Sequence, residues 1–219
     1  MKKAEVRARI EEIGIIPGIR VSTAARARFA GEAVHRAGIP IAEITMTVPG
    51  AIDVISHLAK TLPTMVVGAG TVLDTEMARR ALDAGASFLT STGLVPEVVE
   101  FALKNDALVF PGALTPSEVI AAWKTGADFV KIFPCGPLGG PHYIRSLKLP
   151  FPQVPLIATG GVNQQTAGNF ILAGAAALGI GSELINPEGL PLMKEEQIQE
   201  LARRYLGIVK AARAQISGG

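Results

Sequence analysis

One lysine stands out because it interrupts an apolar run that has the length of a buried strand. Lys131 lies between Phe129 and Phe133, and the alternation of a strand puts all three side chains on one face. A lysine inside a fold must lose its charge or find a partner. A buried, neutral amine can attack a ketone and form a Schiff base. The pattern predicts a nucleophilic lysine, with a structural lysine paired to a carboxylate as the alternative.

A carboxylate occupies a matching position in another apolar run. Glu43 shares a strand face with Ile41 and Thr45. Such a carboxylate can pair with Lys131 as a purely structural ion pair. It can also move protons at a carbon next to a carbonyl group. The residue pattern by itself leaves both interpretations open.

Glycines follow the last two apolar runs of the chain. Gly160 and Gly161 follow the run 156–159, and Gly181 and Ser182 follow the run 177–180. Residues without a side chain let backbone N–H groups approach an anion closely. We therefore expect a phosphate site, with tight turns that hold no ligand as the alternative.

Eight short apolar runs are the strands that we expect to position these residues. They lie at 15–20, 41–45, 65–69, 88–90, 108–110, 129–132, 156–159 and 177–180. Amphipathic stretches lie between them, and several of these end in a glycine that precedes the next run, as at Gly85 and Gly126. The alternation predicts an α/β fold, a (β/α)8 TIM barrel with its chemistry at the carboxyl ends of the strands. A doubly wound open sheet is the alternative.

We expect a single barrel domain over residues 1–219. An extra N-terminal helix is predicted over 1–14, the barrel core over 15–185, and a C-terminal helix over 192–215. The stretch 133–155, rich in proline and glycine, predicts a long loop with a short helix around 143–147. Thr115, Pro116 and Glu118 form a strong helix-start signal.

The composition excludes several classes of protein. With 48% hydrophobic residues, 18% charged residues and a net charge of +2, the chain is neither disordered nor an evident nucleic-acid binder. No apolar run has the length of a membrane span, and no signal-peptide pattern opens the chain. The lone cysteine, Cys135, fits a reducing compartment, so we expect a cytoplasmic protein. No cluster has metal-ligand spacing, so we expect no metal.

Four segments together resemble the 2-keto-3-deoxy-6-phosphogluconate (KDPG) aldolase / 4-hydroxy-2-oxoglutarate aldolase family. They are Glu43–Thr45, Val67–Val72, Val130–Pro134 and Thr159–Val162, and they occur in order within a similarity that spans about 15–185. The resemblance implies a class I, metal-free aldolase on a (β/α)8 barrel. It also implies no cofactor, a small 2-keto acid as substrate, and a homotrimer.

The resemblance assigns roles to individual residues. Lys131 resembles the Schiff-base lysine, and Glu43 resembles the general acid/base. Thr71 and Thr159 match positions near the pyruvyl carboxylate, and Phe133 matches an aromatic residue at the pyruvyl pocket. The positions that match the phosphate site are Gly160, Gly161, Gly181 and Ser182.

Two departures from the family pattern concern the distal part of the substrate. Many members carry an arginine where this chain has Thr47, and that arginine helps to hold the carboxylate or the distal anion. We expect Thr47 and Arg20 to bind substrate, with Arg20 supplying the missing positive charge. Many members also carry a proline where this chain has Thr92. The expected reaction is cleavage of KDPG to pyruvate and glyceraldehyde 3-phosphate. Its alternatives are a 4-hydroxy-2-oxoglutarate or phosphogalactonate aldolase, another phosphate-binding barrel enzyme such as an isomerase or thiamine-phosphate synthase, and a non-catalytic oligomeric scaffold.

Overall fold

The computed structural model describes residues 1–187 and 194–218. The strands are β1 (Ile15–Ile19), β2 (Ile41–Thr45), β3 (Val66–Gly70), β4 (Phe88–Thr90), β5 (Leu108–Phe110), β6 (Gly112–Ala113), β7 (Val130–Ile132), β8 (Leu156–Thr159) and β9 (Ala177–Ile180). The helices are α1 (Lys3–Ile13), α2 (Ala24–Arg36), α3 (Ala51–Thr61), α4 (Thr75–Asp83), α5 (Pro96–Lys104), α6 (Pro116–Lys124), α7 (Pro141–Lys148), α8 (Ala167–Leu172) and α9 (Glu195–Ser217), with the 3-10 helix η1 (Gly136–Leu138).

The strands form one parallel sheet in the order β5-β4-β3-β2-β1-β9-β8-β7-β6. Only Pro111 separates β5 from β6, so these two segments are halves of one barrel strand, one pairing with β4 and the other with β7. Proline has no N–H to donate to a ladder, which explains the interruption. Its carbonyl still accepts from Lys131 N at 3.0 Å. The sheet therefore closes as a barrel, which confirms the predicted (β/α)8 fold.

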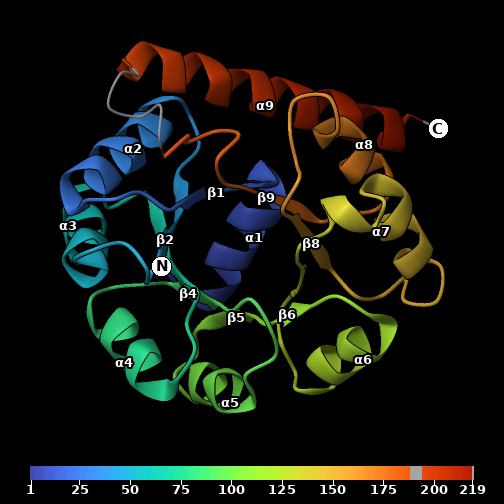
Figure 1. Cartoon of the computed structure of the whole chain (residues 1–219), viewed down its shortest axis with the longest axis horizontal. Coiled ribbons are helices and arrows are strands. Elements are labelled where there is room, and N and C mark those ends of the chain that lie inside the picture. Colours follow the sequence, from blue (N-terminus) through green and yellow to red (C-terminus); the bar gives the residue numbers. More distant parts are fainter. Residues whose placement is uncertain (188–193, 219) are drawn as a thin grey trace.

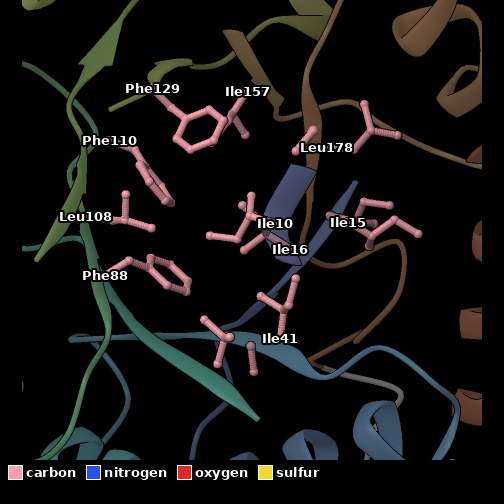
Figure 2. Close-up of a cluster of buried hydrophobic side chains, with 14 of the residues drawn as sticks. Ile10, Ile15, Ile16, Ile41, Phe88, Leu108, Phe110, Phe129, Ile157 and Leu178 are labelled. Carbon is pink, nitrogen blue, oxygen red and sulfur yellow. The ribbon is translucent and has the colours of Figure 1, made fainter. Parts of the chain in front are cut away.

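Helices surround the barrel, and α9 crosses one side of the ring against α2 and α8 (Figure 1). The extra N-terminal helix α1 lies at the amino ends of the strands. Its Lys3 Nζ is 3.0 Å from Asp128 Oδ2, and its Arg7 guanidinium lies over the Phe129 ring. Ile10 of the same helix is fully buried and points into the core (Figure 2).

Three phenylalanines fill the barrel interior beneath the carboxyl ends of the strands (Figure 2). Phe88 stacks on Phe110 with ring centroids 5.1 Å apart, and Phe110 meets Phe129 edge to face, also at 5.1 Å. Phe129 lies two residues before Lys131 on the same strand face. This aromatic cluster fills the barrel below the lysine, and the cavity that Lys131 lines opens at the carboxyl-terminal end.

The local signals read from the sequence have their expected structures. Thr115 caps α6 in a reciprocal capping box with Glu118. Gly85 and Gly126 adopt φ values of 103° and 84°, the left-handed conformation that ends a helix before the next strand. Among the described residues, no helix is long and apolar enough to cross a membrane.

Several boundaries differ slightly from the predictions. The strand expected at 65–69 lies at Val66–Gly70, and Arg20 lies just after β1 rather than within it. The C-terminal helix runs over Glu195–Ser217, whereas 192–215 was expected, and residues 192 and 193 lie outside the described residues. The short helix expected around 143–147 is the longer α7.

Candidate active site

A cavity of about 470 Å³ opens at the carboxyl ends of the barrel strands. Nine of the predicted site residues line it, namely Lys131, Glu43, Arg20, Phe133, Thr159, Gly160, Gly161, Gly181 and Ser182. Thr92, which stands where many family members have proline, lines it too. The two other predicted residues, Thr47 and Thr71, lie outside this lining and contact Arg20 instead.

Lys131 projects from β7 into the base of this cavity and is only 6% exposed. Its Nζ donates a hydrogen bond to Thr90 Oγ1 at 2.9 Å and lies 3.5 Å from Glu43 Oε1. The Phe133 ring centroid is 5.9 Å from the same nitrogen. A buried amine between a hydroxyl and a carboxylate fits the interpretation as a nucleophile with a nearby proton acceptor.

Glu43 reaches the lysine from β2 because a glycine on the next strand leaves space for its side chain. Thr45 is in register with Gly70 on β3, and a Cβ built at Gly70 would overlap the Glu43 carboxylate. A Cβ at Gly68 would likewise overlap the Phe88 ring. The two glycines of the Val67–Val72 segment therefore accommodate one side chain of the site and one of the aromatic cluster beneath it.

Arg20 is held at the cavity wall by threonines from two neighbouring strand ends. Its two terminal nitrogens donate to Thr47 Oγ1 at 2.9 Å and to Thr71 Oγ1 at 3.1 Å. Thr71 adopts φ 60°, a left-handed conformation that is unusual for a β-branched residue. The guanidinium keeps further N–H donors, so the same side chain can also bind a ligand carboxylate.

The double glycine after β8 lines the cavity and keeps its backbone carbonyls turned away from its backbone donors. The Thr159 carbonyl accepts from Cys135 N at 2.9 Å, and the Gly160 carbonyl accepts from Gly136 N at 2.8 Å. Both carbonyls thus face the loop after β7. In a trans peptide the N–H points opposite to the C=O, so the N–H groups of Gly160 and Gly161 face away from that loop, and both residues line the cavity. This arrangement suits an anion.

Two hydroxyl groups at the site add information that the residue pattern did not supply. Thr159 Oγ1 is buried and has no hydrogen-bond partner among the described residues, and a Cβ at Gly179 would overlap it. A ligand oxygen in the cavity can satisfy this hydroxyl.

Thr90 was not predicted as a site residue. The available signal was alternation, since Thr90 shares the inward strand face of Phe88.

Cys135 packs beside the site without taking part in its open surface. Its side chain is fully buried, and Sγ donates to the Gly160 carbonyl at 3.2 Å. Burial raises the pKa of the thiol to about 11, so it stays protonated at neutral pH. The side chain is a small packing residue. Across the described part of the chain, no group of three His, Cys, Asp or Glu side chains could hold a metal ion.

Comparison with known proteins places the chain in a family. The model of the KDPG and KHG aldolase family matches residues 6–203. The chain belongs to this family. It is accordingly a carbon–carbon lyase of the class I pyruvate aldolase type, with a small keto acid as the class of substrate.

Individual relatives have similar lengths but modest identity. The 2-dehydro-3-deoxy-phosphogluconate aldolase of Pseudomonas aeruginosa is 29% identical over 206 residues, which cover 94% of this chain and 93% of the relative. A Rhizobium meliloti protein, named as a probable 2-dehydro-3-deoxy-6-phosphogalactonate aldolase, is 31% identical over 157 residues, covering 71% and 74%. Identity at this level does not separate one aldolase substrate from another.

A solved structure resembles the whole fold. It is the KDPG aldolase of Legionella pneumophila with pyruvate captured as a covalent carbinolamine intermediate. It matches with a TM-score of 0.82 and 29% identity, covering 90% of this chain and 96% of that chain.

Proposed function

We propose that this aldolase cleaves KDPG to pyruvate and glyceraldehyde 3-phosphate, with Lys131 as the Schiff-base nucleophile and Glu43 as the general acid/base. The observation that carries the proposal is the buried pair of Lys131 Nζ and Glu43 Oε1, 3.5 Å apart at the base of the cavity. The purely structural ion pair remains the competing interpretation. It does not account for a cavity that opens directly onto both groups.

In the proposed reaction, neutral Lys131 Nζ attacks C2 of the keto acid. The carbonyl oxygen takes one proton from the nitrogen and one from solvent and leaves as water, which gives an iminium ion. Glu43, directly or through a water molecule, takes the proton of the C4 hydroxyl. The C3–C4 bond breaks, its electrons reach the iminium nitrogen, and the aldehyde departs. The resulting enamine is protonated at C3 with the help of Glu43, and hydrolysis of the iminium releases pyruvate and restores the amine.

The remaining cavity residues bind the two anionic ends of the substrate. Arg20, positioned by Thr47 and Thr71, binds the pyruvyl carboxylate together with the unpartnered Thr159 hydroxyl. Phe133 borders the pyruvyl group. The distal phosphate lies against the backbone N–H groups of four residues, Gly160, Gly161, Gly181 and Ser182.

A second candidate substrate is 2-dehydro-3-deoxy-6-phosphogalactonate, which has the same functional groups but the opposite configuration at C4. The match to the Rhizobium meliloti protein favours it, because that relative is named for this substrate. A third candidate, 4-hydroxy-2-oxoglutarate, lacks the phosphate. Comparing kcat/KM for the three substrates separates them, and a preference for the unphosphorylated acid would refute the proposed phosphate site.

Lys131→Met tests the nucleophile because methionine keeps the length and apolar stem of lysine but has no amine. We expect cleavage to fall to background while the circular dichroism spectrum stays that of a folded protein. Retained cleavage would sink the assignment. The matched control is Lys124→Met, which removes a lysine from the end of α6, far from the cavity lining.

We further propose that the protein acts in the cytoplasm, as its lone cysteine indicates, and that it is a homotrimer, as the family resemblance implies. Mass photometry at low and high protein concentration tests the trimer. A monomer with full activity would refute any need for assembly, whereas a large closed assembly without activity would favour the scaffold alternative.

A further inference from the structure

We propose that Thr90 is a positioning residue for Lys131: its hydroxyl receives the single N–H of the iminium and so fixes the plane in which the pyruvyl group is held. The inference rests on the proposed Schiff-base function of Lys131. Thr90 has no role in the reaction steps proposed above.

Thr90 and Lys131 are far apart in the sequence, and the barrel fold brings their side chains together. It ends β4, on the same inward face as Phe88, while Lys131 lies on β7. The halves of the fifth strand, β5 and β6, stand between them. The two side chains meet in the barrel interior, where Lys131 Nζ and Thr90 Oγ1 are 2.9 Å apart.

The Thr90 hydroxyl is buried, and its hydrogen-bond partner is the amine of Lys131. Thr90 is 1% exposed, and Lys131 Nζ is the hydrogen-bond partner of its Oγ1 within the part of the chain that the structure describes. A buried hydroxyl without a partner is unfavourable. Valine has nearly the same shape and would fill the position without that cost. The hydroxyl therefore has a clear function only in relation to the lysine.

The neighbours of Lys131 Nζ indicate where its two N–H bonds and its lone pair point. A neutral amine has two N–H bonds and one lone pair besides its bond to Cε. Thr90 lies along one direction at 2.9 Å, and Glu43 along another at 3.5 Å. When Thr90 Oγ1 accepts one N–H bond and the other N–H points toward the Glu43 carboxylate, the lone pair is left for the cavity, where the keto carbon must approach.

The same contact constrains the intermediate. When the amine adds to the keto carbon, a C–N bond forms, the C=O π bond breaks, and the nitrogen passes one proton to the oxygen. A second proton, supplied by solvent, lets that oxygen leave as water, and the nitrogen keeps one N–H. The nearer acceptor, Thr90 Oγ1, holds that N–H, and the planar C=N group then has one orientation. Glu43 is left free to exchange protons with the C4 hydroxyl and with C3. Thr90 should thus affect the steps after binding more than binding itself.

Thr90→Val and Thr90→Ser test this inference. Valine keeps the shape without the hydroxyl, and we expect kcat for cleavage and the rate of pyruvate methyl deuterium exchange to fall on the order of ten- to a hundredfold. KM should stay within about threefold, because Thr90 acts on the iminium and not on the free substrate. Serine restores the hydroxyl and should recover rates to within about threefold of the parent. Thr90→Ala replaces the valine variant if that variant fails to fold.

The controls separate this inference from the function on which it rests. Ser91→Ala removes a neighbouring buried hydroxyl that donates to the Gly93 carbonyl at 2.7 Å, and it should change Tm without changing kcat. Borohydride reduction of the parent with pyruvate reports the Schiff base itself. An adduct on Lys131 together with parental rates in folded Thr90→Val would overturn the role of Thr90 and leave the aldolase proposal standing. Absence of an adduct in the parent would overturn the proposed function first, and this inference with it.

Discussion

Replacing Gly70 with alanine should disable the site through a single methyl group. The new Cβ would lie 2.6 Å from Glu43 Cδ and 2.7 Å from Cγ, whereas ordinary contact begins at 3.4 Å. The Glu43 side chain must therefore move by roughly 0.8 Å or more, the difference between these distances. Gly70 ends a regular strand and is not in the left-handed region, so alanine adds no backbone strain there.

The expected cost of that movement is large for activity and moderate for stability. A misplacement of about 1 Å at a reacting group can cost on the order of a hundredfold in rate. Overpacking a buried site typically costs about 1–3 kcal/mol, and each kcal/mol lowers Tm by roughly 2–4 °C in a protein of this size. We therefore expect a folded Gly70→Ala variant whose kcat/KM is about a hundredfold lower.

A coupled lactate dehydrogenase assay for released pyruvate measures the activity, and a double-mutant cycle identifies the cause. In a Glu43→Ala background no carboxylate remains to be displaced, so Gly70→Ala should cost little further activity. Gly93→Ala is the matched control, because a Cβ there meets nothing within 4 Å. A Gly70→Ala variant with kcat/KM within about threefold of the parent would refute the reasoning that the position of Glu43 governs the reaction.

Three further predictions concern other parts of the molecule. Arg20→Met should raise the KM for pyruvate in the methyl deuterium exchange reaction about tenfold, because it removes a charged hydrogen-bond donor. Arg79→Met, on an exposed helix face, should leave that KM unchanged. Equal KM values for the two variants would show that Arg20 does not bind pyruvate. Gly207→Ala, at an exposed position in α9 where a Cβ meets nothing, should stabilise the protein by roughly 0.5–1 kcal/mol in urea unfolding, and a loss of stability would contradict the helical geometry there. Because the native pKa of Cys135 is raised from 9.0 to about 11, its contribution to stability is fully present below pH 9 and is lost as the pH rises through 11. Between pH 8 and 10 the parent should accordingly lose about 1 kcal/mol more than Cys135→Ala, and identical losses would show that the thiol titrates normally.

The parts of the fold and site that could be predicted from sequence are those set by local rules. Strand alternation placed Lys131 and Glu43 on inward faces, and the capping box at Thr115 and the glycine at Gly85 marked helix ends. These features depend on residues a few positions apart, so the one-dimensional pattern contains them.

What could not be predicted depends on closure of the barrel. The contact between Thr90 and Lys131 joins residues 41 positions apart, across the strand that lies between theirs. The hydrogen bonds from Arg20 to Thr47 Oγ1 and Thr71 Oγ1 were not predicted either, because the direction of a long side chain at a strand end is set by tertiary contacts. The split of the fifth strand at Pro111 likewise appears only when both neighbouring strands are present.

Borohydride trapping is the most direct test of the central claim. The protein is incubated with pyruvate and reduced, and the modified peptide is mapped by mass spectrometry among the nine lysines of the chain. The account predicts a reduced pyruvyl adduct on Lys131, and no adduct in Lys131→Met. An adduct on another lysine, or none in a protein that circular dichroism shows to be folded, would contradict it and make Lys131 a structural residue.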